Sequence, residues 1–425
     1  MPRKRPRIQA PADAAEDGAT RREAPPHSTR PKQERAYLVA VDSGTRPGEM
    51  STEESMRELA RLVRTAGGWV AGSATQRRPH PDPAYYIGTG KIEEIGEQRG
   101  ATDYSMVVFD DALSPSQQFN LEQAFGVRIY DRSALILDIF AKRARTREAS
   151  LQVELAQHEY LMPRLRGQWQ HLERMEGAIN SRGPGETQLE TDRRLIGARI
   201  ARLKKQIEQV RKQRDLQRSR RRRQGLPTVA LVGYTNAGKS SLMRALAGAK
   251  VLVADAVFAT LDPVTRRIGS GAEEAFLLTD TVGFMQKLPT QLVSAFRATL
   301  EELGEADLLL HVVDATASTR DAQVRTVLDT LRELGLHDMP VLTVMNKVDG
   351  LTLEDGTPVT TEDDLRRLAA EHDPRVEGEV RYASATTGLG IDALRHRLLY
   401  EFFGLEGTPH AEGEPASNGA YAPGR

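Results

Sequence analysis

The sequence predicts an α/β protein in which two parallel-sheet domains are joined by a helical hairpin. Short apolar runs alternate with helical patterns over residues 36–142 and again over residues 225–404, which is typical of parallel sheets covered by helices. Residues 143–224 are polar and helical in pattern. Residues 1–35 and 405–425 have little to bury, so both ends are expected to be disordered tails.

Whole-chain composition excludes several classes of protein. Lys+Arg and Asp+Glu are both 59, so the net charge of zero indicates no polyanionic partner by itself. Without cysteine there can be no disulfide, thiolate metal site or cysteine nucleophile. The basic start is followed by no apolar segment, and no run reaches the length of about 18 apolar residues that a membrane span needs. We therefore expect a cytoplasmic protein without a membrane span.

The first domain, residues 36–142, contains four strand candidates and at least two well-marked helices. The strands are YLVAVD, GWVAG, SMVVFD and VRIYD. Ser51 with Glu54, and Ser114 with Gln117, have the spacing of a capping box, and Pro115 occupies the favoured first helical position. This order of strands and helices predicts a small domain with a largely parallel sheet.

The hairpin, residues 143–224, is predicted from two long helical patterns. The first runs from Glu148 to about Leu165, and the second begins near Glu186. From Ile196 onward the second helix has apolar residues at steps of 4, 3, 4 and 3, which is the heptad seam of a coiled coil and requires a partner helix. The helix carries Leu189, Ile196, Ile200, Leu203, Ile207 and Val210. An antiparallel pair satisfies both helices, and the connection over residues 166–185 is long enough to be functional or disordered.

The second helix is strongly basic. Residues 193–224 contain fourteen Lys or Arg against two acids, Glu208 and Asp215. Such a face can simply be solvated. It can also bind nucleic acid, because clustered cations release counterions from phosphates. Both interpretations stay open on charge alone.

The start of the second α/β domain has the pattern of a phosphate-binding loop. TVALVG is a strand, and Gly233-x-x-x-x-Gly238-Lys239-Ser240 follows it before an apolar helix. In such loops the backbone N–H groups cradle the β-phosphate, the lysine binds the β- and γ-phosphates, and the hydroxyl after it ligates magnesium. The loop residues assigned to this site are Gly233, Tyr234, Thr235, Asn236, Ala237, Gly238, Lys239, Ser240 and Ser241.

Three later segments complete a guanine nucleotide site. Asp280 ends the strand AFLLTD and would hold magnesium through water, and the Gly283 N–H is available to the γ-phosphate. Asn346 to Asp349 follows the strand PVLTVMN. There Asp349 can accept both N1–H and N2–H₂ of guanine, a donor pair that adenine lacks. Ser384, Ala385 and Thr386 would present a backbone N–H to guanine O6.

Between the first two motifs, VFATLDPVTR places Thr260 to close over magnesium and the γ-phosphate. Lys239, Thr260 and Gly283 are the candidate catalytic residues, and Ser240, Thr260 and Asp280 (through water) are the candidate Mg²⁺ ligands. The cofactors implied are GTP or GDP and Mg²⁺, on a Ras-like doubly wound P-loop domain. The remaining nucleotide contacts are assigned to Phe258, Ala259, Leu261, Asp262, Thr281, Val282, Lys347 and Val348.

One position departs from the Ras pattern. In Ras the residue after the D-x-x-G glycine is a glutamine that orients the attacking water, whereas this chain has Phe284 there. Either the chain is no GTPase, or another group positions the water. An ATP-directed enzyme is disfavoured by Asp349.

These residues resemble the HflX GTPases. The resemblance rests on FATLDPVTR followed by DTVGFMQKLPTQLVSAFRATLEE, and upstream on YYIGTGKIEEI, FDDALSPSQQFNLE, DRSALILDIFAKRARTREASLQVELAQHEYLMPRL and RGPGETQLETDRR, from about Ala36 to Gly404. Members share the apolar residue that Phe284 represents, which implies a GTPase whose water is held by the Gly283 region and Thr260, or by the ribosome. The segment MEGAINSRGPG is less glycine-rich than the corresponding loop of the family.

The resemblance implies a cytoplasmic, ribosome-associated GTPase that splits or rescues stalled ribosomes under stress. Its expected partner is the large (50S) ribosomal subunit and its rRNA, bound through the N-terminal domain and the basic hairpin, with the chain acting as a monomer. A ribosome biogenesis GTPase shares every motif and stays open. A nucleotide-sensing switch with a protein effector also stays open, although such a switch has no need of fourteen clustered cations.

Overall fold

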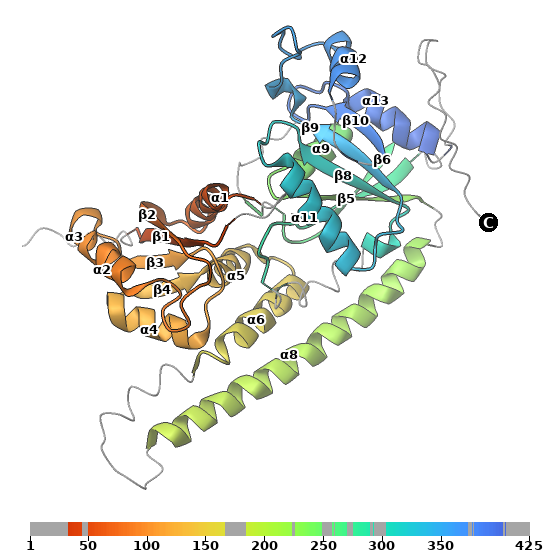
Figure 1. Ribbon diagram of the computed structural model, residues 1–425. Helices are drawn as coiled ribbons and strands as arrows, with labels where there is room; N and C mark the ends of the chain where they lie inside the picture. Colours follow the sequence, from red (N-terminus) through yellow and green to blue (C-terminus); the bar gives the residue numbers. More distant parts are fainter. Residues whose placement is uncertain are drawn as a thin grey trace, which may run out of the picture. The chain divides into compact units, whose positions relative to one another are not determined.

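A computed structural model of the chain describes the positions of most residues (Figure 1). The described residues are 33–44, 50–165, 184–222, 226–248, 257–258, 260–269, 275–289, 292, 303–372, 376, 378–402 and 404; side chains of 184–189, 214–222, 401 and 402 are excepted. From Glu34 onward they belong to one compact unit. The two predicted tails lie outside the described residues, apart from residues 33–35 at the end of the first.

The first sheet has four parallel strands in the order β2-β1-β3-β4. This confirms the parallel sheet that the sequence predicts. The strands are β1 (Arg35–Asp42), β2 (Trp69–Arg77), β3 (Met106–Phe109) and β4 (Arg128–Asp131). The helices are α1 (Thr52–Thr65), α2 (Thr89–Glu97), α3 (Arg99–Thr102), α4 (Pro115–Phe125) and α5 (Arg132–Arg143). Ser51 and Ser114 form the two predicted capping boxes, so both helix starts are confirmed.

Two long antiparallel helices follow, α6 (Arg147–Leu161) and α8 (Pro184–Arg222) (Figure 1). Helix α6 ends earlier than the sequence indicated, because Pro163 has no N–H to continue the helical hydrogen bonding. Leu203 of the predicted seam is fully buried. Ion pairs join the helices between Arg199 and Glu154 at 2.6 Å and between Lys204 and Glu159 at 2.9 Å. The connecting residues 166–183 lie outside the described part.

The second sheet has the order β10-β9-β8-β5-β7-β6. Its strands are β5 (Thr228–Gly233), β6 (Val264–Gly269), β7 (Ala275–Asp280), β8 (Leu308–Asp314), β9 (Val341–Asn346) and β10 (Glu379–Ala383). All pairings are parallel except that of β6 with β7. The sequence did not predict β6, because this edge strand is largely exposed and lacks an apolar pattern.

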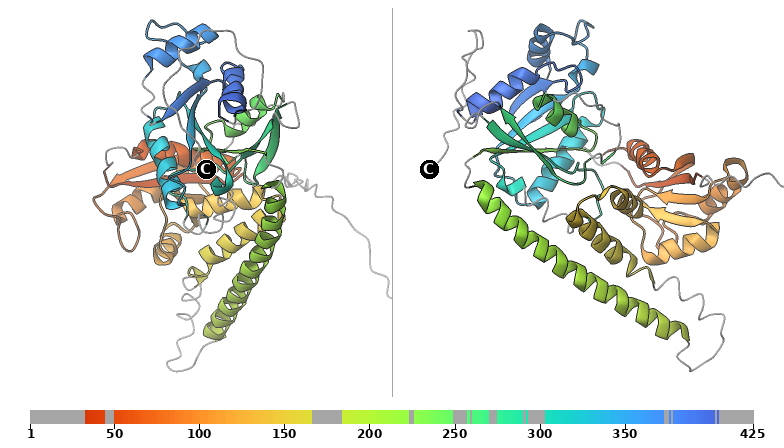
Figure 2. Two further views of the ribbon diagram at one scale, coloured as in Figure 1. Left: turned by 90° about the vertical axis from the view of Figure 1, so that its right-hand side faces the viewer. Right: turned by 180° about the vertical axis from the view of Figure 1, so that it is seen from behind.

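Helices cover both faces of the second sheet, as a doubly wound fold requires (Figures 1 and 2). Val229 and Leu231 of β5 pack with α9 and α13, whereas Ala230 and Val232 belong to the cluster that contains α11. The helical segments are α9 (Lys239–Leu246), α11 (Arg320–Glu333), α12 (Glu362–Glu371), α13 (Ile391–His396), the 3₁₀ turns η1 (Leu303–Glu305) and η2 (Val348–Gly350), and the π-helical turn η3 (Arg397–Phe402).

One hydrophobic cluster contains side chains of both α/β regions. It includes Leu59 and Leu62 of α1, Phe140 of α5, and Phe258 and Phe284 from the second region. The loops that carry Phe258 and Phe284 therefore share a core with α1 and α5. Within the described ranges, none of the helices has the length and apolarity needed to cross a bilayer.

Candidate nucleotide site

The loop after β5 has the backbone shape of a phosphate cradle. Gly233 and Gly238 have φ values of 150° and 95°, in the region that only glycine adopts without strain. A Cβ on Gly233 would lie 2.3 Å from the Val312 carbonyl oxygen, and one on Gly238 would lie 2.2 Å from Nδ2 of Asn346. Both glycines are therefore required by close packing as well as by backbone angle.

Lys239 begins α9 with its ammonium group buried in the loop. Its Nζ donates to the carbonyl oxygens of Gly233 at 3.0 Å and Tyr234 at 2.8 Å. Burial lowers the pKa of Lys239 to about 8, with Asp280 acting in the opposite direction. A Cβ on Gly283 would meet Nζ at 2.9 Å, so the backbone of the D-x-x-G segment runs directly beside the ammonium.

Three oxygen-bearing side chains converge next to Lys239. The Asp280 Oδ2 accepts hydrogen bonds from Ser240 Oγ at 2.6 Å and from Thr260 Oγ1 at 2.7 Å, and the two hydroxyls lie 2.8 Å apart. Asp280 Oδ1 is buried and has no hydrogen-bond partner among the described residues. A buried carboxylate oxygen without a partner is costly unless a ligand satisfies it. This all-oxygen set fits Mg²⁺, which prefers such donors.

The loops that are predicted to bind the base are held in place by Asn346. Its Nδ2 donates to the Ala237 carbonyl at 2.9 Å, and its Oδ1 accepts from the Ala385 N–H at 3.1 Å. One buried amide thus links the phosphate loop to the loop after β10. Lys347 has φ 67° and its ammonium is 2.7 Å from Asp314, while Asp349 is exposed in η2.

The segment around Phe284 lies against the phosphate loop through its main chain. Phe284 N–H donates to the Gly233 carbonyl at 3.1 Å, and Thr235 N–H donates to the Phe284 carbonyl at 2.7 Å. The ring is 2% exposed and packs in the cluster that includes Tyr234 and Phe258. Phe284 therefore anchors this segment in the core.

The structure brings the predicted phosphate, metal and base segments to the carboxyl ends of β5, β7, β9 and β10, as ligand sites in open α/β sheets require. Among the predicted residues, Ser384 is buried and accepts from Thr387 N–H, whereas Thr386 is exposed. Ala259 lies outside the described residues.

A buried charge cluster, which the motifs do not predict, lies next to this site. The Tyr234 hydroxyl donates to Glu58 at 2.7 Å and accepts from the Gln286 N–H at 3.0 Å. Glu58 pairs with the buried Arg132 at 2.7 Å, and Arg132 pairs with Asp110 at 2.5 Å. The one sequence signal for this cluster is a charged residue, Arg132, directly before the apolar run SALILDIF.

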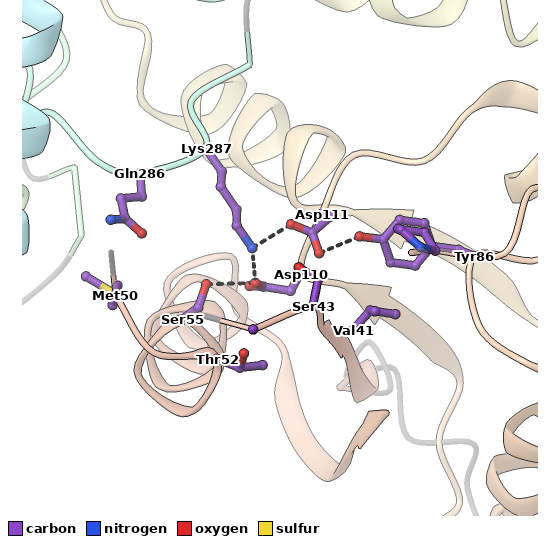
Figure 3. Close-up of a pocket in the computed structure, with 12 residues that line it drawn as sticks. Val41, Ser43, Met50, Thr52, Ser55, Tyr86, Asp110, Asp111, Gln286 and Lys287 are labelled. Carbon is purple, nitrogen blue, oxygen red and sulfur yellow. Dashed lines mark hydrogen bonds and ion pairs between the residues drawn. The ribbon is translucent and has the colours of Figure 1, made fainter. Parts of the chain in front are cut away.

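A pocket of about 370 Å³ adjoins that cluster. Lys287 reaches into it and pairs with both Asp110 and Asp111 (Figure 3). The ammonium nitrogen lies 2.5 Å from a carboxylate oxygen of each. Burial raises the pKa of Asp110, but Arg132 and Lys287 outweigh that effect and the net pKa is lowered. The Asp110 carboxylate is thus held ionised, and both Asp110 and Asp111 are paired with the Lys287 ammonium.

Comparison with known proteins identifies the family. Residues 53–141 match a model described as "GTP-binding GTPase N-terminal", residues 143–221 match "GTP-binding GTPase Middle Region", and residues 228–347 match "50S ribosome-binding GTPase". The chain is 44% identical to "GTPase HflX" of Caldanaerobacter subterraneus subsp. tengcongensis over 87% of this chain and 81% of that protein. The chain belongs to the HflX GTPase family.

HflX of Escherichia coli K12 is 47% identical over 83% of this chain and 80% of that protein. Among solved structures, a GTP-binding protein of Sulfolobus solfataricus in complex with GDP is 24% identical, covering 86% of this chain and 97% of that chain, with a TM-score of 0.44. As a member of the HflX family the chain binds and hydrolyses GTP, and the sequence-based prediction of a GTPase is confirmed.

Proposed function

We propose that this HflX-family GTPase uses its GTP cycle to control binding to the large ribosomal subunit, with the basic helix α8 contacting rRNA. The observation that carries the proposal is the face of α8. Its exposed cations include Arg193, Arg194, Arg202, Lys204, Lys205, Arg211 and Lys212. Clustered exposed cations on one helix favour a polyanionic partner, and the match to a "50S ribosome-binding GTPase" model supports a ribosomal one.

In the hydrolysis step we assign Lys239 to the β- and γ-phosphates and the Gly283 N–H to the γ-phosphate. The pKa of Lys239 is lowered to about 8 by burial, so the side chain is mostly charged near neutral pH, and a bound phosphate would favour the charged form further. Ser240, Thr260 and Asp280 would hold Mg²⁺. The ion, when bound, neutralises charge that develops on the phosphate oxygens. Because Phe284 is buried in the core, the attacking water is oriented by main-chain groups near Gly283 and Thr260, or by the ribosome.

Guanine selectivity is assigned to the loops after β9 and β10. Asp349 is exposed and available to accept the N1–H and N2–H₂ donors. Thr386 is assigned the N–H donor to O6, because the Ala385 N–H donates to Asn346. Asn346 fixes the distance between these loops and the phosphate cradle through its bonds to Ala237 and Ala385. We expect the protein to act in the cytoplasm on stalled ribosomes, and a role in subunit assembly would differ only in the maturity of the bound particle.

The test is GTP turnover by the full chain with and without purified 50S subunits, at low and moderate salt. We expect strong stimulation that falls as salt rises. Arg193→Gln, Arg194→Gln and Lys205→Gln together should weaken binding and reduce the salt slope by about 0.7 to 0.9 for each phosphate that is no longer neutralised. Arg332→Gln with Arg366→Gln, which removes two exposed cations on α11 and α12, is the control for loss of positive charge elsewhere on the surface.

If 50S subunits stimulated the wild-type chain, the α8 variant and the control variant equally, the proposed binding of rRNA by α8 would be wrong. No stimulation of the wild-type chain would instead favour a nucleotide switch with a protein effector.

A further inference from the structure

The last residues of α5 and the turn into α6, residues 140–146, contact the segment that carries Thr260. We call residues 140–146 the corner, and the described residues 257–258 and 260–262 the Thr260 segment. Arg143 Nη1 donates to the Val257 carbonyl at 2.7 Å and also to the Phe258 carbonyl. The guanidinium is partly buried, so these two hydrogen bonds are partly shielded from water. The Thr260 segment is thus held on its N-terminal side.

Phe258 has an unusual backbone conformation at the point where Arg143 binds. Its φ is 58°, in the left-handed region that a bulky aromatic residue rarely adopts. Its ring is buried and meets Phe140 edge-to-face, with centroids 4.5 Å apart. Strained backbone persists only where surrounding contacts determine it. Here the ring contact and the Arg143 hydrogen bond, both from the corner, supply those contacts.

On the other side of Thr260, Asp262 binds the start of α6. Its carboxylate accepts from the main-chain N–H groups of Arg145 at 3.0 Å and Thr146 at 3.2 Å, and from the Thr146 hydroxyl. Thr146 is the N-cap of α6. A carboxylate at a helix N-terminus is favoured by the free N–H groups and the helix dipole. The corner therefore holds the Thr260 segment on both sides of Thr260.

Between these two attachments, Thr260 Oγ1 is 2.7 Å from Asp280 Oδ2 and 2.8 Å from Ser240 Oγ. We infer that Arg143 is a positioning residue for GTP hydrolysis: the corner fixes Thr260 at the Ser240–Asp280 pair and ties it to the first turn of α6. The inference rests on the proposed role of Thr260 at Mg²⁺ and the γ-phosphate. It adds a physical connection between the nucleotide site and the helical hairpin.

The connection predicts a difference between nucleotides. In GTPases this segment is ordered by γ-phosphate and Mg²⁺ contacts and is released after hydrolysis. If the hydrogen bonds from the corner to the Thr260 segment are removed, the affinity for a GTP analogue should therefore fall, while the affinity for GDP should stay nearly unchanged. The coupling is reciprocal. If a partner displaces the start of α6, the affinity for GTP should change, and GTP binding should shift the position of α6 by the same coupling free energy.

The experiment measures affinities of the full chain for GDP and for a non-hydrolysable GTP analogue across a Mg²⁺ series, with kcat and KM for GTP. For Arg143→Ala we expect about tenfold weaker analogue binding, as for the loss of about 1.4 kcal/mol, a higher Mg²⁺ requirement, and GDP affinity within about twofold. Arg143→Lys should be intermediate, because an ammonium lacks the planar fork of a guanidinium. Arg145→Ala is the matched control, since Arg145 contacts Asp262 through its main-chain N–H.

Thr146→Val gives a second variant should Arg143→Ala fail to fold. It removes the hydroxyl that binds Asp262, and Thr146→Ser should restore binding. Equal losses for GDP and the GTP analogue, or no loss in either variant, would overturn the inference. Thr260→Ala separates it from the proposed site: if that variant binds the GTP analogue normally, the role of Thr260 fails and the inference with it. If Thr260→Ala weakens binding and the corner variants do not, the corner inference alone is wrong.

Discussion

Each of the two sheets has charged side chains where its parallel strands end, but the two clusters differ in how their charges are matched. In the first, Asp110 accepts from Arg132, Lys287 and Ser55, and Asp111 accepts from Tyr86 and pairs with Lys287. In the second, Asp280 Oδ1 is buried without a partner in the described part of the chain. The carboxylates of the first cluster find their partners within the protein, whereas Asp280 Oδ1 of the second cluster requires a partner from a bound ligand.

The difference separates a structural joint from a ligand site. Both clusters contain a buried aspartate and a lysine, so the types of residue do not distinguish them. A buried polar atom without a hydrogen-bond partner does distinguish them, because nearly all buried polar atoms in native proteins have such a partner. The Arg132 cluster joins α1, the end of β3, Tyr234 and the segment after Phe284, and we interpret it as the joint between the two α/β regions.

Removing the central cation of the joint should have the largest effect. Arg132→Met leaves Glu58 and Asp110 buried without their guanidinium partner, which typically costs about 3–5 kcal/mol. The free energy of unfolding from urea titration measures this. Arg366→Met, which breaks an exposed pair with Asp363 on α12, should cost less than about 1 kcal/mol. Equal effects of the two substitutions would show that the cluster is no joint.

The same substitution in both clusters sharpens the comparison. Asp280→Asn should reduce Mg²⁺-dependent GTP hydrolysis about 10- to 100-fold, as for other groups that hold a metal through water. Asp111→Asn, in the complete cluster, should leave hydrolysis within about twofold. Turnover across a Mg²⁺ series tests both. If Asp111→Asn lost activity as Asp280→Asn does, the first cluster would have to be part of the catalytic site.

Lys239 and Lys287 also differ, because we assign a phosphate ligand to Lys239, whereas Lys287 is paired with Asp110 and Asp111. With the pKa of Lys239 lowered to about 8, both the free and the bound protein carry its proton below pH 8, so affinity there is insensitive to pH. Above pH 8 the free protein loses the proton and binding must restore it, so affinity should fall by about tenfold per pH unit. Calorimetry at pH 9 in two buffers of different ionisation enthalpy should detect uptake of about one proton. A flat affinity between pH 7 and pH 9 would contradict the low pKa.

The fold was largely predictable because each parallel strand and several helix starts have local signals. Capping boxes at Ser51 and Ser114, buried apolar runs, and the spacing from Gly233 to Ser240 are all short-range patterns. The exposed strand β6 has no such pattern and was missed.

The joint and the corner were not predictable for a different reason. Tyr234 and Glu58 are 176 positions apart, and Arg143 and Phe258 are 115 apart. Such contacts depend on how complete elements pack, and a local sequence pattern contains no information about that. Phe284 lies between these two cases. The sequence shows that this position departs from the Ras pattern, but only the structure gives its burial and its main-chain hydrogen bonds to Gly233 and Thr235.

Helix α8 has 39 residues, which at 1.5 Å per residue makes a rod about 58 Å long. Its C-terminal end, Arg222, is followed within six residues by β5, the strand that leads into Gly233. A tilt of only about 5° at that end would displace the far end by about 5 Å, one helical turn. A small rotation where α8 joins β5 is therefore enlarged into a displacement of several ångströms at the opposite end of the helix.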